Sequence, residues 1–545
     1  MVLQGINGEI KNNSSDQLQS WLDLHYGLFI HLGLYSQLGG MWKGEPVKVG
    51  YSEQIQMWAD IPQEEYAAVS KDFTLENFDA KAIVSLAKEA GMKYLVVTSK
   101  HHDGYCLFDT KTTDYNVVKT SPFGKDVLRL LADECQKQGL KFGLYYSLVD
   151  WNEGHAFDHN NNNKIPKSME SLIEEQLTEL MTGYGVIAEV WFDMGHPTVE
   201  QSEKFSHIVR KYQPKAGING RIWNNKGDFR TLNDNQVPYD KLDGPWQTPA
   251  SIYRETWGYR EWQEREDFEH KVLNLLQTLI SVRARGGNYL LNIGPKGDGS
   301  VVPFEADVLK QMGHWLKRHR DAVIGTHPTR FAKPGWGEMT AKNNHLYLHI
   351  FEQPEDKKVK LKGLVTEVEE ITEDGYDKEL EWDKEDTELV VYLPDKLSDP
   401  LVTIIKVTMK GELQLVPEQT VVSETDSWVL TTDKLEKGFN FVDEGNYTSL
   451  EKSNIRLSGY FKNNEAGNYV MKMTGQSNET IDYLVSIGHS DLVVTGKDLN
   501  LKEIGPFSLD KDQQVVPVHI RLYEPQNKYQ DLELECHQLT IQKNK

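Results

Sequence analysis

The amino-acid sequence predicts an α/β protein, a (β/α)8-like barrel followed by two all-β sandwich domains. Three observations lead to this prediction. Up to about residue 325, short apolar runs alternate with amphipathic segments of helical period. After about Lys333 the helical period disappears and short strand patterns take its place. The 545 residues are also too many for one ordinary domain, so two or three compact units are expected.

The barrel is predicted from runs rich in β-branched and aromatic residues, which are typical of parallel strands covered on both faces. The runs are Tyr26–His31, Tyr94–Ser99, Lys141–Ser147, Ala188–Asp193, Ala216–Arg221 and Asn288–Ile293. The helical segments are Asp79–Ala90, Gly124–Gln138, Ser168–Tyr184 and Asp267–Arg283. Six such units favour a barrel. A doubly wound sheet is the alternative, but no Gly-rich phosphate loop follows any of the runs.

The rest of the chain carries strand patterns only. The predicted strands are His345–Phe351, Leu389–Leu393, Val402–Val407, Asn468–Met473, Asp482–Ile487 and Val515–Leu522. We expect the barrel to span residues 1–330, a first sandwich 331–410 and a second sandwich 411–545. The second sandwich is expected to be a brace or spacer, and carbohydrate binding is its alternative role.

Charge and cysteine content exclude several classes of function. With 60 basic and 82 acidic side chains, the formal charge of −22 disfavours nucleic acid and anionic membrane surfaces as partners. Three cysteines cannot form a disulfide framework, and no Cys/His spacing is typical of a zinc site. We therefore expect no metal and no cofactor. The triplet His101-His102-Asp103 is a candidate metal site, but its spacing supplies no third and fourth ligand nearby, so a metal is not expected there.

The sequence also bears on localisation. It has no apolar stretch of 18 residues, so no membrane span is predicted. Its first 17 residues lack the basic and apolar regions of a signal peptide. We expect a bacterial protein that is exported to the periplasm or secreted, with its leader removed, and a cytoplasmic location is the alternative.

Polar and aromatic residues gather where the predicted barrel strands end, which is where barrel enzymes place their catalytic groups. They are His31, Lys100, His101, His102, Asp103, Tyr145, Tyr146, Asp150, Trp151, Trp191, Asp193, Asn219 and Arg221. Each has a structural alternative: a lone histidine can be a satisfied core residue, Asp193 a helix cap, and Tyr146 or Trp191 plain core. As a set, they predict a pocket for a hydroxyl-rich ligand.

Several motifs resemble those of the α-L-fucosidases of glycoside hydrolase family 29. In chain order they are YGLFIHLGLYS, YSEQ with IPQEEY, AGMKYLVVTSKHHDGYCLFDT, GLYYSLVDW, EVWFDMG and RGGNYLLNIGPKGDG. The resemblance covers roughly residues 20–325. The strands that follow are similar to the family's C-terminal β-sandwich, and the last 130 or so residues carry no recognisable motif.

The resemblance implies an exo-acting hydrolase that releases terminal α-L-fucose with retention, through two carboxyl groups and a covalent intermediate. Asp193 matches the family's nucleophile. Trp257 matches the aromatic that packs on the apolar face of the sugar, and Trp191 is expected to line the same pocket. The positions that match fucose-binding residues are His31, Glu53, His101, His102, Tyr146 and Arg221.

The proton donor is where the resemblance breaks. The two positions at which branches of the family carry the acidic glutamate hold amides here, Asn233 and Gln247. An amide cannot donate and recover a proton at useful pH. Three interpretations follow: another carboxyl group serves, the reaction depends on a good leaving group or substrate assistance, or hydrolysis is lost while binding remains. Among carboxyl groups, Glu255 is ranked first, then Asp228, with Asp234 also a candidate.

The resemblance thus implies a retaining α-L-fucosidase acting on fucosylated oligosaccharides or fucose-containing polysaccharides. Two alternatives stay open: a non-hydrolytic fucose-binding protein on a degenerate barrel, and a glycosidase of a related sugar such as L-galactose or a sulfated fucose. Neither linkage specificity nor oligomeric state is predicted.

Overall fold

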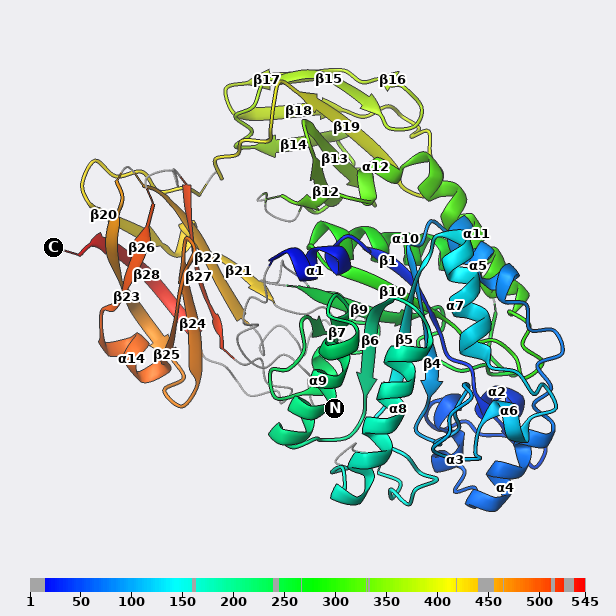
Figure 1. Ribbon diagram of the computed structural model, residues 1–545. Coiled ribbons are helices and arrows are strands. Elements are labelled where there is room, and N and C mark those ends of the chain that lie inside the picture. The colour runs from blue at the N-terminus through cyan, green and yellow to red at the C-terminus, as the bar shows by residue number, and fades with distance from the viewer. Residues whose placement is uncertain are drawn as a thin grey trace.

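Figure 1 shows the chain as a barrel surrounded by helices, a β domain beside it, and a second β domain at the C-terminal end. The structure is a computed structural model. It describes residues 15–158, 163–238, 245–265, 267–329, 331, 334–417, 419–439, 455–463, 465–510, 515–523 and 534–544. Residues 1–14 lie outside the described residues. They include most of the N-terminal segment that was compared with a signal peptide.

The barrel is one eight-stranded sheet whose neighbouring strands are all parallel, in the order β7-β6-β5-β4-β1-β10-β9-β8. A parallel bridge between Asn219 and Phe229 joins the two edge strands, so the sheet closes on itself. The strands are β1 (Tyr26–Ile30), β4 (Tyr94–Lys100), β5 (Lys141–Ser147), β6 (Ile187–Asp193), β7 (Gly217–Ile218), β8 (Arg230–Thr231), β9 (Trp246–Ser251) and β10 (Asn288–Ile293). The predicted barrel is confirmed.

Helices cover the outer face of this sheet (Figure 1), and the four predicted helices are confirmed within a few residues at each end. Local sequence fixes their ends: Asp79 and Asp126 accept backbone N–H bonds as N-caps, and Gly139 ends α7 in the left-handed conformation. The helices are α1 (Ser15–Leu22), α2 (Leu34–Leu38), α3 (Ile55–Trp58), α4 (Gln63–Ala68), α5 (Ala80–Glu89), α6 (Val117–Thr120), α7 (Val127–Gln138), α8 (Glu170–Gly183), α9 (Val199–Tyr212), α10 (Phe268–Ala284), α11 (Pro303–Arg318) and α12 (Arg320–Val323).

The barrel departs from the prediction between residues 216 and 251. The predicted strand Ala216–Arg221 is only the two-residue β7, followed by a 3-10 turn at Gly220–Ile222. Strands β8 and β9 were not predicted, because β8 is two residues long and β9 mixes Gln, Thr, Pro and Ser into its buried run. The barrel thus has two strands that apolar patterning does not reveal.

Inward-facing side chains fill the barrel in layers, as in other barrels of this kind. The floor contains Gln247, whose amide nitrogen donates to the Tyr94 hydroxyl and to the Glu189 carboxylate. A Cβ on Gly27 would lie 2.3 Å from the Tyr94 ring, so only glycine fits there. The layer above is aromatic, and its members are Phe29, Tyr145 and Trp191. The uppermost positions, at the carboxyl ends of the strands, therefore stand on a rigid aromatic layer.

The segment after the barrel forms two antiparallel sheets around one apolar core. The six-stranded sheet contains β11 (His327–Pro328), β12 (Gly337–Lys342), β13 (His345–Ile350), β15 (Val368–Glu373), β16 (Lys378–Glu379) and β19 (Thr403–Met409). The three-stranded sheet contains β14 (Lys358–Lys362), β17 (Trp382–Glu385) and β18 (Glu388–Tyr392). A small hairpin, β2 (Met41–Trp42) and β3 (Glu45–Pro46), lies within the barrel segment.

The C-terminal part is likewise two facing antiparallel sheets with a separate apolar core. One sheet contains β20 (Ser427–Thr431), β23 (Gly467–Ser477), β26 (Ile504–Leu509) and β28 (Leu534–Lys543). The other contains β21 (Glu436–Phe439), β22 (Ile455–Lys462), β24 (Asp482–Ile487), β25 (Ser490–Thr495) and β27 (Val515–Leu522), and the short helix α14 (Gly496–Leu501) follows β25. The domain boundaries at residues 330 and 410 stay predictions.

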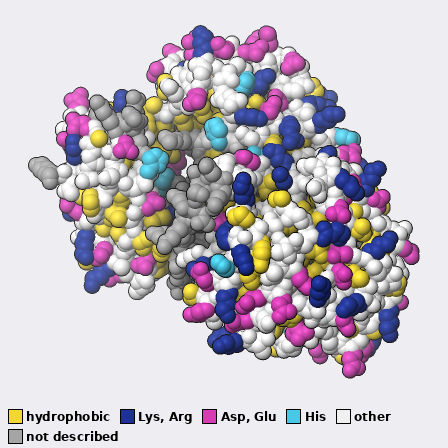
Figure 2. Space-filling model, viewed as in Figure 1, with side chains coloured by type: hydrophobic (Ala, Val, Ile, Leu, Met, Phe, Trp, Pro, Cys, Tyr) yellow, Lys and Arg dark blue, Asp and Glu magenta, His cyan; other side chains and the backbone are white. Residues whose placement is uncertain are grey.

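Two global properties complete the fold. On the face shown in Figure 2, basic and acidic side chains intermingle over the barrel and form no extended basic area. Among the helices of the described residues, none combines the length and apolarity that crossing a membrane requires.

Candidate active site

Asp193, the last residue of β6, lies at the carboxyl end of the barrel and is held from two sides. The Tyr145 hydroxyl donates to its Oδ2 over 2.8 Å, and Nη1 of Arg221 donates to its Oδ1 over 2.8 Å. Nε2 of His102 lies 3.8 Å from Oδ2. The residue that follows, Met194, has φ of 56°, a backbone strain that is typical of functional sites.

Burial alone would raise the pKa of Asp193, but the charge of Arg221, the nearby His102 and the hydrogen bonds from Arg221 and Tyr145 together outweigh it. The net effect holds the pKa of this carboxyl below its ordinary value. Asp193 is therefore ionised at neutral pH. An ionised carboxylate that two neighbours hold in one orientation is poised to act as a nucleophile.

Three buried imidazoles stand beside this carboxylate. Burial lowers the pKa of His31 to about 3 and of His102 to about 4, and it holds the pKa of His101 well below the ordinary value. All three are neutral at pH 7. The Nδ1 atom of His31 lies 2.7 Å from Oδ1 of Asn292, and that of His102 lies 2.8 Å from the Ser147 hydroxyl. Neutral rings can both donate to and accept from hydroxyl groups.

His101 differs from the other two imidazoles in its hydrogen bonding. Its ring lies parallel to Tyr145, at 5.4 Å between centroids, and 3.9 Å from the ring of His102. Its Nδ1 is buried and has no hydrogen-bond partner among the described residues. A buried polar atom without a partner is costly, and a bound hydroxyl group would satisfy it.

The opposite wall is formed by Trp257, which follows β9. Its ring lies 5.2 Å from that of His31 and 5.9 Å from that of Phe29. The buried Glu53 carboxylate accepts hydrogen bonds from the backbone N–H groups of Trp257 and Gly258, over 3.0 and 2.9 Å. Burial raises the pKa of Glu53 to about 7. Glu53 thus anchors the backbone that carries the tryptophan.

Trp191 lies two residues before Asp193 on β6, with its side chain on the same face of the strand, and it contacts the Arg221 guanidinium that binds Asp193. The centre of the Arg221 guanidinium lies 4.7 Å from the Trp191 ring centroid, within the range of a cation–π contact. The Trp191 indole N–H donates to Oε1 of Gln247 over 2.9 Å. The structure therefore brings seven of the predicted binding residues and Asp193 into one barrel mouth: His31, Glu53, His101, His102, Trp191, Arg221 and Trp257.

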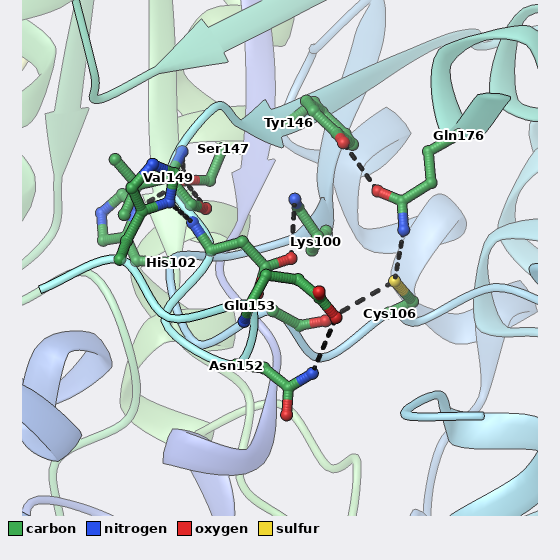
Figure 3. A network of polar contacts seen from close by, with 12 residues as sticks. Lys100, His102, Cys106, Tyr146, Ser147, Val149, Asn152, Glu153 and Gln176 are labelled. Atoms are coloured by element: carbon green, nitrogen blue, oxygen red, sulfur yellow. Dashed lines mark hydrogen bonds and ion pairs between the residues drawn. The ribbon is translucent and has the colours of Figure 1, made fainter. Parts of the chain in front are cut away.

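Tyr146 is a correction, because the structure turns it away from Asp193. Tyr146 pairs in register with Phe192, which lies outside the barrel, whereas Tyr145 pairs with Trp191 inside it. The Tyr146 hydroxyl donates to Gln176 on α8 over 2.6 Å, and Nζ of Lys100 lies 4.5 Å from its ring centroid. Figure 3 shows Tyr146 pointing to Gln176, while His102 contacts Ser147 elsewhere in the network. Alternation along a strand gives the site Tyr145 instead.

Asp228 does not reach the site either. It forms an ion pair with Arg210 on α9, and its Oδ2 accepts the Ile218 backbone N–H over 2.7 Å. These partners lie around β7 rather than at Asp193. Its described contacts hold this carboxylate at the edge of the barrel, and its expected role as the acid stays a prediction.

Glu255 lies in the loop after β9, with an exposed side chain whose Oε2 is 3.5 Å from Nε2 of Gln263. Its backbone carbonyl accepts from Arg260 over 2.9 Å. None of its described contacts is with Asp193, Arg221 or the three imidazoles. The structure thus leaves the role of Glu255 untested.

The two amide positions have different surroundings. Gln247 is completely buried in the barrel floor, where its amide nitrogen donates to both oxygens of Glu189 over 3.0 and 2.9 Å. A glutamate at this position would lie beneath the aromatic layer and away from the mouth. Asn233 lies in the half-buried loop after β8, next to Asp234, whose Oδ1 is 2.9 Å from Nη2 of Arg221.

Sequence reasoning placed Tyr145 among the strand-end residues without assigning it a role at Asp193, and it missed Ser147 and Asn292, which orient His102 and His31. Side chains alternate between the two faces of a strand, so Trp191 and Asp193 share the inner face of β6. The residue that pairs with Trp191 on the neighbouring strand shares that face, and this residue is Tyr145 rather than Tyr146. Asn292 lies one residue before the end of β10, and no sequence pattern marks it as a partner of His31. The two residues meet because β10 pairs with β1. No group of three or more His, Cys, Asp and Glu side chains in the described part of the chain is arranged to hold a metal ion.

Two curated α-L-fucosidases are similar in sequence to this chain. The chain is 26% identical to an α-L-fucosidase of Dictyostelium discoideum over 378 residues, which are 63% of this chain and 80% of that protein. It is 27% identical to the human tissue α-L-fucosidase over 410 residues, which are 70% of this chain and 86% of that protein.

Solved structures agree. A family 29 α-L-fucosidase from Bacteroides thetaiotaomicron, trapped as a covalent intermediate, superposes with a TM-score of 0.66 at 25% identity, over 75% of this chain and 99% of that one. An α-L-fucosidase from Vibrio sp. strain EJY3 superposes with a TM-score of 0.70 at 23% identity and covers 97% of this chain and 98% of that one. The latter likeness shows the fold alone, and it extends over nearly the whole chain.

The family model described as α-L-fucosidase matches residues 4–321, which contain every residue of the site. This match spans more than half of the chain. The chain therefore belongs to the α-L-fucosidase family, glycoside hydrolase family 29.

Proposed function

We propose that Asp193 of this chain is the nucleophile of a retaining α-L-fucosidase and that the surrounding side chains bind the fucose. The family performs retaining hydrolysis of α-L-fucosides, and this chain is a glycoside hydrolase of that kind. Its substrates are fucosylated glycans. The observation that carries the assignment of Asp193 is a buried, ionised carboxylate that Tyr145 and Arg221 hold at the carboxyl end of β6.

The proposed reaction follows from this geometry. The free electron pair of Asp193 attacks the anomeric carbon from a fixed position and displaces the leaving oxygen to give a covalent fucosyl-enzyme. Water then attacks the same carbon and releases Asp193. Two inversions return the starting configuration. Tyr145 and Arg221 donate hydrogen bonds that orient the carboxylate before attack, and they donate to it again when hydrolysis has released it.

The neutral imidazoles suit the binding of hydroxyl groups. His31 and His102 are fixed by Asn292 and Ser147 through one ring nitrogen, so the other nitrogen of each is available to a sugar hydroxyl. The unpartnered Nδ1 of His101 offers a further position. The Trp257 ring supplies an apolar surface on which the C6 methyl group can pack. A methyl-compatible wall favours fucose over L-galactose, whose C6 carries a hydroxyl.

Within the glycan class, we propose fucosylated oligosaccharides or fucose-containing polysaccharides outside the bacterial cytoplasm as the natural substrates. An exo-acting enzyme needs only a terminal residue that enters a closed barrel mouth. Release of fucose from these two substrate types, together with fractionation of the host cell, checks this finer assignment.

The test of Asp193 is turnover of 4-nitrophenyl α-L-fucoside. The unmodified protein is expected to release nitrophenol and α-L-fucose, the latter identified by its anomeric signal in NMR at early times. Asp193→Asn is expected to lower kcat by about 10⁴-fold or more while fucose still binds. Undiminished turnover in Asp193→Asn contradicts the assignment, and saturable binding without any release by the unmodified protein favours the non-hydrolytic alternative. Faster release from the L-galactoside would favour the related-sugar alternative.

A further inference from the structure

Arg221 binds two carboxylates at once. Its Nη1 lies 2.8 Å from Oδ1 of Asp193, and its Nη2 lies 2.9 Å from Oδ1 of Asp234. The exposed fractions of the two carboxylate side chains differ, 13% for Asp193 and 21% for Asp234. The second carboxylate is thus the more open to water and to whatever stands above the barrel mouth.

The two carboxyl groups share one partner, and retention requires two carboxyl groups that lie close together. Retaining glycosidases need a nucleophile and an acid/base about 5–5.5 Å apart. Arg221 holds Oδ1 of Asp193 at 2.8 Å and Oδ1 of Asp234 at 2.9 Å from the two terminal nitrogens of one planar guanidinium, which keeps the two carboxyl groups close together. Inverting enzymes need a wider gap of about 6.5–9.5 Å to admit a water molecule.

The loop that carries Asp234 is fixed at the barrel mouth. It begins directly after β8, so Asp234 lies beyond the carboxyl end of a barrel strand, as Asp193 does at the end of β6. The neighbouring Asn235 joins the loop to β9: its N–H donates to the Pro249 carbonyl over 2.9 Å, and its Oδ1 accepts the Ser251 N–H over 2.8 Å. Asn235 has φ of 58°, which turns the chain sharply after Asp234.

We propose that Asp234 is the general acid/base of this enzyme, an inference that rests on the proposed function of Asp193. In the first step Asp193 attacks the anomeric carbon, the bond from that carbon to the glycosidic oxygen breaks, and the Asp234 proton passes to that oxygen. In the second step the Asp234 carboxylate takes a proton from water as the water oxygen attacks the anomeric carbon. The ester bond to Asp193 breaks, and both side chains return to their starting states.

Arg221 has a defined part in this cycle. After the first step Asp234 is negatively charged, and Nη2 donates to that charge while Asp193 is neutralised as an ester. After the second step Asp193 is charged again and Nη1 donates to it. One guanidinium therefore stabilises whichever carboxylate carries the charge. Arg221 is a positioning residue for both, and lysine cannot replace it because lysine lacks two parallel donors.

The other candidates fit less well. Asp228 is held by Arg210 and the Ile218 backbone near β7. Asn233 has no ionisable group. Glu255 is exposed in the loop after β9, and its described side-chain contact is with Gln263. Among the described carboxyl groups of these loops, Asp234 is the one that the structure ties to the nucleophile through a shared partner.

The test is chemical rescue of Asp234→Ala by azide, with Asp234→Asn as a variant of nearly unchanged shape. On a fucosyl disaccharide, whose leaving group is poor, each variant is expected to lose about 10²–10⁴-fold in kcat/KM. On 4-nitrophenyl α-L-fucoside the first step needs little acid, so a burst of nitrophenol equal to the enzyme should precede slow turnover. Azide needs no general base, so it should raise kcat of Asp234→Ala and yield the α-L-fucosyl azide, with configuration retained.

Two controls make the result specific. Asn233→Ala changes the adjacent side chain and is expected to keep the activity of the unmodified enzyme and to give no azide product. Glu255→Gln and Glu255→Ala pass through the same assays as the rival acid. Equal losses of Asp234→Asn on both substrates, or azide rescue of Glu255→Ala instead, would overturn the inference. Failure of the proposed function is a different result, since the unmodified enzyme would then release no nitrophenol at all.

Discussion

The barrel and the C-terminal sandwich both bury large aromatic side chains, yet they differ in what lies beside those rings. In the barrel, Trp191 and Tyr145 are surrounded by buried carboxylates and imidazoles. In the described part of the C-terminal sandwich, the rings of Trp428 and Tyr469 pack against an almost entirely apolar core. Its buried polar residues are Ser458, Asn463, Ser477, Ser486 and Arg521.

The difference indicates that the buried side chains of the barrel serve the reaction as well as stability, whereas those of the C-terminal sandwich serve stability. Burying an ionisable group costs free energy unless partners compensate, so a domain keeps such groups where they serve a function. The barrel keeps Asp193, Glu53 and Glu189 inside, with the pKa of Asp193 lowered by Arg221 and those of the glutamates raised by burial. The C-terminal sandwich has the composition of a support. Its expected role as brace or spacer stays a prediction.

The first sandwich differs from the C-terminal one because buried polar contacts join it to the barrel. His319, at the end of α11, lies between Asp374 and Asp399 of the sandwich, at 2.8 and 3.3 Å. Arg285 at the end of α10 forms a 2.8 Å ion pair with Glu338 of β12. The C-terminal sandwich has its own apolar core, so we expect that it can lose stability without disturbing the barrel.

The largest expected effect is on stability and falls on the C-terminal sandwich. Trp428 is 2% exposed and lies 4.9 Å from Phe461 and 5.9 Å from Tyr469, between ring centroids. Trp428→Ala should lower the free energy of unfolding of this domain by about 3–5 kcal/mol, because a large cavity is left. Thermal unfolding followed by calorimetry should show an earlier transition, while kcat on 4-nitrophenyl α-L-fucoside stays unchanged at 25 °C. A parallel loss of kcat would show that the sandwich and the barrel mouth are coupled.

The sequence predicts the barrel well where strands are long and uniformly apolar. The predicted run Lys141–Ser147 coincides with β5, and Asn288–Ile293 coincides with β10. The sequence does not predict β8 or β9. Strand β8 has only two residues and therefore shows no periodicity, and the buried residues of β9 include polar ones such as Gln247, so β9 lacks an apolar run. Tertiary pairing, rather than local preference, creates these two strands.

The site divides along similar lines. Asp193 and the histidines could be placed because they stand at strand ends in recognisable motifs. Tyr146 was misplaced by one residue, which in a strand reverses the direction of the side chain. Asp234 was named only as one of several carboxyl groups, because its contact with Arg221 depends on how the loop after β8 folds back over the barrel.

A smaller effect distinguishes the two adjacent tyrosines. Tyr145→Phe removes the hydroxyl that donates to Asp193, and hydrogen bonds to charged groups contribute about 1.5–3 kcal/mol, so kcat/KM should fall by roughly 10- to 100-fold. Tyr146→Phe removes a hydroxyl that donates to Gln176 outside the barrel and should leave kcat/KM unchanged. Steady-state kinetics of the two variants on one aryl fucoside provide the comparison. If Tyr146→Phe has the greater effect, the inward assignment of Tyr145 is wrong.

The last prediction concerns the pH dependence of barrel stability. Burial raises the pKa of Glu189 from its ordinary value of 4.5 to about 7, although Trp21 and Gln247 donate to its carboxylate. The folded barrel therefore holds this proton more tightly than the unfolded chain does. Its contribution to the free energy of unfolding is complete below pH 4.5, declines by no more than about 1.4 kcal/mol per pH unit as the pH rises to 7, and is constant above.

Glu189→Gln keeps the shape of the side chain and removes its titration. Between pH 4.5 and 7, the barrel of the unmodified protein should therefore lose more stability than that of the variant, and above pH 7 the two curves should run parallel. Thermal midpoints of activity loss, taken across this range, report on the barrel alone. The Trp428→Ala variant is the matched control, because its mutation lies in a core whose described residues include no buried carboxylate, and it should leave the slope for the barrel unchanged. Equal slopes for Glu189→Gln and the unmodified protein would mean that Glu189 is already ionised in the folded barrel at pH 4.5, held so by Trp21 and Gln247.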